Sequence, residues 1–244
     1  MNEKKFRSLR AEVGGTALIA ALTTEETRDM FLYMAGEIIA SRPLLVKLDG
    51  RMEGDTYGRE LTDGFTSVVN TLTQHPPFAI NNIFQNSGIS MVTSTKGFIG
   101  IFFGTLFLAG VKGMPVMKKL TVHKLALIFA NSLQLLKVWE DMGGDAAIML
   151  YAFEAAVLAF TQSAKEGDTL LQALAVAESS AKEVMEQVRH CRSDQDFHRT
   201  SCKAAEYDPG AATIWLVLKS MREWVAFLEN IRTSVASAGG KDSE

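Results

Sequence analysis

The stretch GFIGIFFGTLFLAGV, residues Gly97 to Val111, is the longest apolar run of the chain. It is too short to cross the roughly 30 Å hydrocarbon layer of a membrane as a helix. A helix that is apolar all round is stable in water only when other elements surround it. The stretch therefore predicts a core helix from about Phe98 to Lys112.

Apolar residues recur at helical spacing on both sides of this run, and the alternation typical of strands is almost absent. Thr23 and Glu26 have the spacing of a capping box, and Pro209 stands at a first helical position. The remaining predicted helices cover about 24–42, 59–73, 78–90, 121–139, 145–165, 169–191 and 209–235. The chain is thus predicted to be all-α, with a single domain that forms an antiparallel eight-helix bundle or barrel over residues 23–235. Residues 1–22 are expected to form an N-terminal arm or helix, and residues 236–244 a disordered tail.

Length and charge narrow the class of protein. The chain has 244 residues and a net charge of −3, which does not favour a nucleic-acid-binding protein. Its two cysteines, Cys191 and Cys202, do not form a disulfide framework. Glu3 and Glu12 interrupt the basic and apolar start, so a signal peptide is not favoured. We expect a cytoplasmic protein without a membrane span.

The loop LDGRMEGDTYG, from Leu48 to Gly58, places three carboxylates close together, on Asp49, Glu53 and Asp55. Short acidic loops of this kind supply the oxygen ligands of Mg²⁺ and Ca²⁺. An EF-hand fits only in part, because Arg51 would occupy a ligand position. The alternative interpretation is a solvated turn whose acidic residues cap the neighbouring helices.

Two further loops lie at helix junctions. In GISMVTSTKGFIG, residues 88–100, hydroxyl side chains and Lys96 precede a helix N-terminus, where backbone N–H groups favour an anion such as phosphate. No Walker A motif occurs in the chain, and an ordinary helix start is the alternative. In HRTSCKAAEYDPGAA, residues 198–212, Arg199 and Lys203 could face phosphate, and Asp208-Pro209-Gly210 could turn the backbone against a ligand. The alternative there is a surface loop followed by a helix cap.

The order of these loops resembles the nucleotide-binding L subunit, or kinase domain, of the dihydroxyacetone kinases. The segments that carry the resemblance are LDGRMEGDTYGRELTDGFTSVV, GISMVTSTKGFIGIFFGTLFLAG, GGDAAIMLY and DPGAATI. It covers roughly Phe31 to Leu228. The resemblance implies an eight-helix antiparallel barrel that binds ADP or ATP through two Mg²⁺ ions. It also implies a partner subunit that holds dihydroxyacetone and, in some bacteria, a phosphotransferase-system subunit as phosphoryl donor. A homodimer is a further assembly to consider.

The same resemblance assigns site residues. Asp49, Glu53 and Asp55 would bind Mg²⁺, and no residue of this chain is assigned a catalytic role. The nucleotide would be bound by Tyr57, Gly58, Thr93, Ser94, Thr95, Lys96, Gly97, Gly144, Asp145, Arg199, Asp208, Pro209 and Gly210.

Several positions depart from the family pattern. An alignment without a gap puts Gly54 and Thr56 at the paired-aspartate positions. A small shift puts either Glu53 and Asp55 or Asp55 and Tyr57 there, and the first choice keeps three carboxylates. Elsewhere the family residues are replaced by Lys96, Ile99, Ala146, Ala147 and Leu150.

Two functions therefore stay open. One is a phosphotransferase subunit that passes a phosphoryl group to dihydroxyacetone or a related small ketose on its partner. The other is a degenerate, non-catalytic barrel that binds a partner protein or an apolar ligand. An unrelated helical bundle is a third, more general interpretation.

Overall fold

The computed structural model describes residues 19–49, 56–138, 145–195 and 207–239. These residues form helices α2 (Thr24–Ala40), α3 (Arg42–Asp49), α4 (Thr56–Gln74), α5 (Ile80–Ser94), α6 (Phe98–Gly110), α7 (Val122–Leu136), α8 (Asp145–Lys165), α9 (Leu170–Gln195) and α10 (Pro209–Gly239). Two short strands, β1 (Leu22–Thr23) and β2 (Lys119–Leu120), pair in antiparallel orientation.

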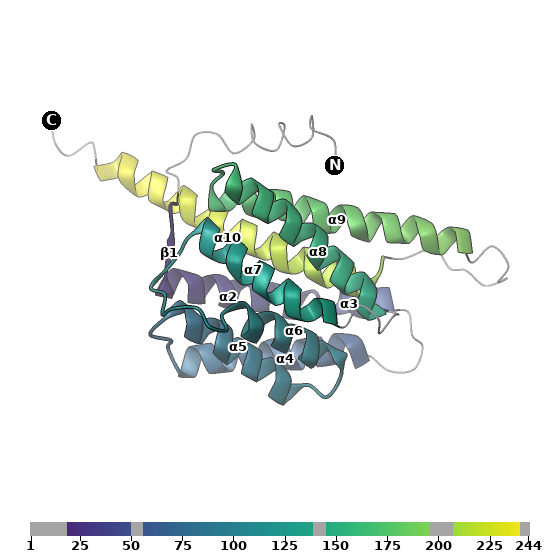
Figure 1. Ribbon diagram of the computed structural model, residues 1–244. Coiled ribbons are helices and arrows are strands. Elements are labelled where there is room, and N and C mark those ends of the chain that lie inside the picture. Colours follow the sequence, from purple (N-terminus) through teal and green to yellow (C-terminus); the bar gives the residue numbers. More distant parts are fainter. Residues whose placement is uncertain (1–18, 50–55, 139–144, 196–206, 240–244) are drawn as a thin grey trace.

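Eight of these helices form a closed ring (Figure 1). Each helix from α4 to α9 packs against the next helix along the chain, and α2 closes the ring by packing against both α4 and α10. The short α3 packs against α4 and α10 outside the ring order. The prediction of an all-α, antiparallel eight-helix barrel is confirmed.

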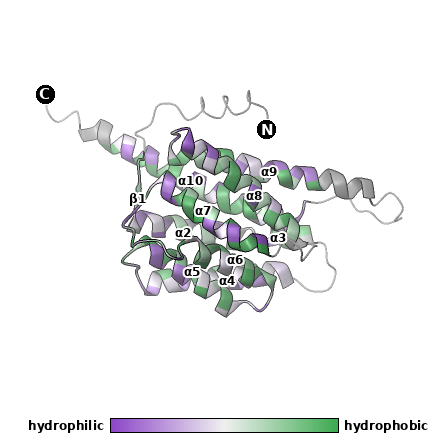
Figure 2. Cartoon of the chain, in the orientation of Figure 1, coloured by the Kyte–Doolittle hydropathy of each residue, from purple (hydrophilic) through white to green (hydrophobic). Residues whose placement is uncertain are grey.

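Hydrophobic residues alternate with hydrophilic ones along most helices, whereas α6 has no strongly hydrophilic residue (Figure 2). The α6 residues Phe102, Phe103 and Phe107 are buried and form ring contacts that continue to Phe65 of α4 and to Phe31 of α2. The long apolar stretch is therefore the core helix that its composition predicted.

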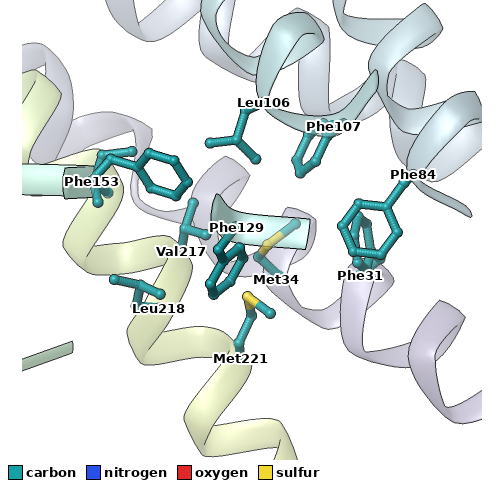
Figure 3. Close-up of a pocket in the computed structure, with 11 residues that line it drawn as sticks. Phe31, Met34, Phe84, Leu106, Phe107, Phe129, Phe153, Val217, Leu218 and Met221 are labelled. Atoms are coloured by element: carbon teal, nitrogen blue, oxygen red, sulfur yellow. The ribbon is translucent and has the colours of Figure 1, made fainter. Parts of the chain in front are cut away.

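The interior contains a small apolar cavity of about 20 Å³ (Figure 3). Its lining has no polar surface and comes from Phe31, Met34, Phe84, Leu106, Phe107, Phe129, Phe153, Ile214, Val217, Leu218 and Met221. This volume is close to the minimum for one water molecule, and an apolar cavity of this kind stays dry. This described cavity is too small for a lipid-sized ligand.

Contacts between α2, α10 and the segment that precedes α2 close the ring. Thr23 and Glu26 form the predicted capping box of α2, and Arg232 of α10 donates to the Glu26 carboxylate. Burial acts to raise the pKa of Glu26, but the Thr23 backbone N–H and Arg232 together hold it below its ordinary value. Near the end of α10, the carboxylate of Glu229 accepts the Ile19 N–H at 3.2 Å.

The structure differs from the sequence-based expectation at three places. The prediction that the chain breaks at Pro43 missed α3, because proline is compatible with the first turn of a new helix. The pairing of β1 with β2 was not predicted, since two-residue strands leave no alternating pattern. Helix α10 continues through residues 236–239, which were expected to belong to a disordered tail. Alanine there favours the helix, and the glycine pair 239–240 follows only later.

Candidate functional site

The helix ends that border the loops singled out by the sequence lie at one end of the barrel. Because neighbouring helices are antiparallel, the ends of α3, α5, α7 and α9 lie at the same end as the starts of α4, α6, α8 and α10. This end is on the right in Figure 1. Residues far apart in sequence therefore meet around the start of α4.

Tyr57 joins the start of α4 to the start of α10. Its hydroxyl lies 2.8 Å from Thr213 Oγ1 and donates to the Pro209 carbonyl at 3.1 Å. Thr213 also donates to the Pro209 carbonyl, at 2.8 Å. Gly58, the next residue of α4, is buried. Tyr57, near the end of the acidic loop, is thus fixed against the Asp-Pro-Gly segment.

Asp208 is the N-terminal cap of α10. It is fully buried, and its Oδ1 accepts the Ala211 N–H at 2.9 Å. Gly210 lies close to α8, since a Cβ there would be 3.0 Å from the Cβ of Met149. Asp208, Pro209 and Gly210 therefore hold the first turn of α10 against α8 and α4, as a capped helix start predicts.

The three hydroxyl residues before α6 belong to the end of α5. Thr93 donates to the Ile89 carbonyl at 2.8 Å, Ser94 to the Ser90 carbonyl, and Thr95 to the Met91 carbonyl at 2.9 Å. These bonds point the hydroxyl groups back along α5. An anion at this loop would therefore meet mainly the backbone N–H groups of the first turn of α6 and the exposed Lys96.

Gly97 is the N-cap of α6 and makes no side-chain capping bond. The carboxylate of Glu60, from α4, lies directly against it: a Cβ on Gly97 would be 2.2 Å from Oε2 and 2.7 Å from Oε1. The space that a small residue leaves for a phosphate is thus held by a carboxylate in this conformation. Phosphate fits there only if Glu60 moves or if a cation lies between the two anions.

Two of the departures from the family pattern are core residues. Ile99 and Leu150 are each only 3% exposed. Ile99 lies in the first turn of α6, and Leu150 lies in α8. Their side chains pack inside the barrel, so neither faces a polar ligand.

Part of the predicted site lies outside the described residues, namely Glu53, Asp55, Gly144 and Arg199. Asp49 ends α3 and Asp145 begins α8, and only their backbones are described. Among the side chains that the structure describes, no group of three or more His, Cys, Asp or Glu residues could hold a metal ion. The Mg²⁺ site thus remains a prediction from the acidic loop.

Sequence reasoning did not assign Glu60 and Thr213 to the site. Both could have been found from helical spacing, because Glu60 is one turn after Tyr57 and Thr213 is one turn after Pro209. Which loop each one contacts depends on the tertiary packing.

The described residues include one helical segment, Ala147–Lys165, that has the length and composition of a membrane span. Half of its apolar window is buried inside the barrel, as in the core helix of a globular protein.

Comparison with known proteins gives matches over most of the chain. The DAK2 domain pattern matches residues 53–223. The PEP-dependent dihydroxyacetone kinase, ADP-binding subunit DhaL, of Escherichia coli (strain K12) is 22% identical over 195 residues, which is 78% of this chain and 92% of that protein.

Two crystal structures of the dihydroxyacetone kinase of C. freundii share the fold. The native form gives a TM-score of 0.60 at 16% identity and covers 86% of this chain and 36% of the kinase chain. The complex with AMP-PNP and Mg²⁺ gives a TM-score of 0.58 at 17% identity, and the match covers 86% of this chain and 35% of the kinase chain. This chain thus spans about a third of those kinase chains. Because the domain pattern extends from the acidic loop to the middle of α10, the chain belongs to the DAK2 domain family.

Proposed function

We propose that this chain is the nucleotide-binding subunit of a dihydroxyacetone-kinase-type phosphotransferase. It would bind ADP or ATP with Mg²⁺ at the loop-bearing end of the barrel. It would pass a phosphoryl group to dihydroxyacetone or a related small ketose, held on a substrate-binding partner subunit. In an organism with a phosphotransferase system, a third subunit would supply the phosphoryl group.

The observation that carries this proposal is that the starts of α6 and α10 both contact the first two turns of α4. Tyr57 hydrogen-bonds to the start of α10, and Glu60 contacts the start of α6. The last three residues of the acidic loop, Thr56 to Gly58, form the start of α4. These contacts support a nucleotide site at this end of the barrel, because such a site needs its binding groups held close together.

Different residues of the chain would bind the metal ion, bind the nucleotide and hold the site in place. Asp49, Glu53 and Asp55 would hold Mg²⁺, which when bound neutralises and bridges the phosphates. The first turn of α6 and Lys96 would bind phosphate oxygens, with Gly144, Asp145 and Arg199 completing the nucleotide site. Asp208 and Tyr57 would keep the start of α10 in place.

Thermal unfolding with ADP or ATP, with and without Mg²⁺, tests this function. A nucleotide at about 100 times its Kd should add roughly 2.7 kcal/mol to the free energy of unfolding. We expect a Mg²⁺-dependent rise for the wild type and its loss in Asp55→Ala. Asp63→Ala is the matched control, because Asp63 is exposed further along α4 and the same charge is removed. An absence of any shift at saturating Mg-nucleotide would contradict the proposal.

A second candidate is a barrel of this family that binds a partner protein and transfers nothing. It is favoured by the burial of Ile99 and Leu150 and by the hydroxyl groups of Thr93 and Thr95, which bond to α5 carbonyls. This function predicts no nucleotide shift in the same experiment.

A further inference from the structure

The surface of α6 has an apolar stripe that the barrel does not cover. Ile101, Thr105 and Leu108 follow one another at helical spacing along its outer side, and Lys112 stands just after the helix ends. Ile101 is 43% exposed, although most of α6 is buried. Such a stripe on a helix that is apolar all round indicates a surface that another element covers.

This stripe forms the floor of an open groove of about 310 Å³. Val92 of α5 lines one side, and Leu135 of α7 lines the other. Both side chains are more than 40% exposed, and so are Ile89 on α5 and Leu127 on α7. From Ile101 to Leu108 the helical floor is about 10 Å long, which is the length of about two helical turns. The groove therefore has the dimensions to seat one short helix.

The part of the barrel that contains the groove carries positive side chains but no negative ones. Residues 64–139 contain six lysines and no aspartate or glutamate, whereas the whole chain has 28 acidic residues. Within the described ranges, no carboxylate pairs with Lys112, which lines the groove just after the end of α6. A partner with carboxylates beside its apolar residues would be complementary to this surface.

We propose that the groove formed by α5, α6 and α7 binds an amphipathic helix of a partner protein that carries acidic side chains beside its apolar stripe. Helix-in-groove binding uses apolar anchors at i, i+3, i+4 and i+7, a span of about two turns that matches the length of the apolar floor. A second copy joined through the same face would set lysines against lysines without a carboxylate between them. The concave shape fits a helix better than a flat lipid surface. This proposal does not depend on the nucleotide site.

Fluorescence anisotropy with two labelled helical peptides tests the groove. Both peptides carry leucines at i, i+3, i+4 and i+7; one has glutamates beside them and the other has lysines. The wild type should bind the glutamate peptide about tenfold or more tightly than the lysine peptide at low salt, and added salt should reduce the preference. Ile101→Ser should weaken the glutamate complex about tenfold, and Lys112→Glu should narrow the preference between the peptides.

Phe227→Ser is the matched control, since Phe227 is 60% exposed on α10, across the ring from α6, and its replacement should leave both affinities unchanged. Melting curves of all variants verify that each one folds. The proposal is overturned if the wild type binds neither peptide or binds both equally, or if Ile101→Ser behaves like Phe227→Ser. Self-association that Ile101→Ser abolishes, or sedimentation with phosphatidylserine vesicles without peptide binding, would also overturn it in favour of a second copy or a lipid surface.

Discussion

Glu60 lies one turn after Tyr57 on α4, with its carboxylate against Gly97 at the start of α6. A phosphate group bound at this helix start would lie close to that carboxylate, and like charges a few ångströms apart repel each other by several kcal/mol in a partly solvated site. A Mg²⁺ ion between them would turn the repulsion into attraction. On the proposed function, ADP without Mg²⁺ should therefore bind Glu60→Gln about tenfold more tightly than the wild type.

Isothermal titration with ADP in the presence of a chelator measures this effect. Asp63→Asn is the control, because it removes one charge from an exposed position of α4, farther along the helix. Equal affinities of wild type and Glu60→Gln would show that Glu60 does not oppose the phosphates. An equal gain in Asp63→Asn would show a general effect of net charge.

At this scale the sequence could identify candidate ligands but not their partners. The sequence Asp208-Pro209-Gly210 predicted a capped helix start, and the Ala211 N–H bond to Asp208 confirms it. This prediction was possible because a cap depends only on residues close in sequence. Helical spacing places Glu60 and Thr213 one turn after Tyr57 and Pro209, but their contacts with distant helices could not be predicted from the sequence. The hydroxyl groups of Thr93 and Thr95 were expected to face an anion, and their bonds to carbonyls depend on α5 continuing to Ser94.

At the scale of elements, the close packing of α5 against α6 depends on glycine residues at the contact between the two helices. A Cβ on Gly100 would be 1.8 Å from Thr95 Oγ1 and 2.9 Å from the Met91 carbonyl oxygen. We expect Gly100→Ala to lower the free energy of unfolding by about 1–3 kcal/mol, because the added methyl group forces the helices apart. Urea unfolding midpoints with unchanged slopes measure the loss.

Gly36→Ala is the matched comparison for that change. A Cβ on Gly36, in the middle of α2, would meet no atom within 4 Å. The same substitution there should raise the free energy of unfolding by up to about 1 kcal/mol through helix propensity alone. If the two variants change stability in the same direction, then close packing does not explain Gly100.

Most of these elements could be predicted because their signals are local. The capping box of Thr23 and Glu26 formed as predicted, and Thr121, where a helix was predicted to begin, is the N-cap of α7. Helix α3 and the pairing of Leu22 with Leu120 were not predicted, since short elements are stabilised mainly by their tertiary neighbours. Gly100 and Gly104 are one turn apart and let α6 approach α5 closely, since a Cβ on Gly104 would be 2.3 Å from a Val92 side-chain carbon.

At the scale of the whole molecule, closure of the ring depends in part on a buried carboxyl group. Glu229 of α10 is 1% exposed; its Oε1 accepts the Ile19 N–H, whereas Oε2 has no hydrogen-bond partner among the described residues. Burial raises the pKa of Glu229, although the Ile19 N–H and Arg232 partly oppose the increase. The folded chain therefore retains this proton to a higher pH than the unfolded chain does.

The sign of the effect on stability follows from that difference in pKa. Below the pKa of the unfolded state, the carboxyl group is protonated in both states, and its contribution to the free energy of unfolding is fully present. This contribution is lost as the pH rises through the raised pKa of the folded state. Glu229→Gln removes this titration and keeps an oxygen for the Ile19 N–H. The variant should gain stability relative to the wild type as the pH rises from acidic to neutral, by at most about 1.4 kcal/mol per pH unit, the limit for one proton.

Urea unfolding of both proteins between pH 4 and 8 measures the difference. A difference that does not change with pH would show that the proton is bound equally in both states, and one that falls with rising pH would show that Arg232, rather than burial, dominates at Glu229.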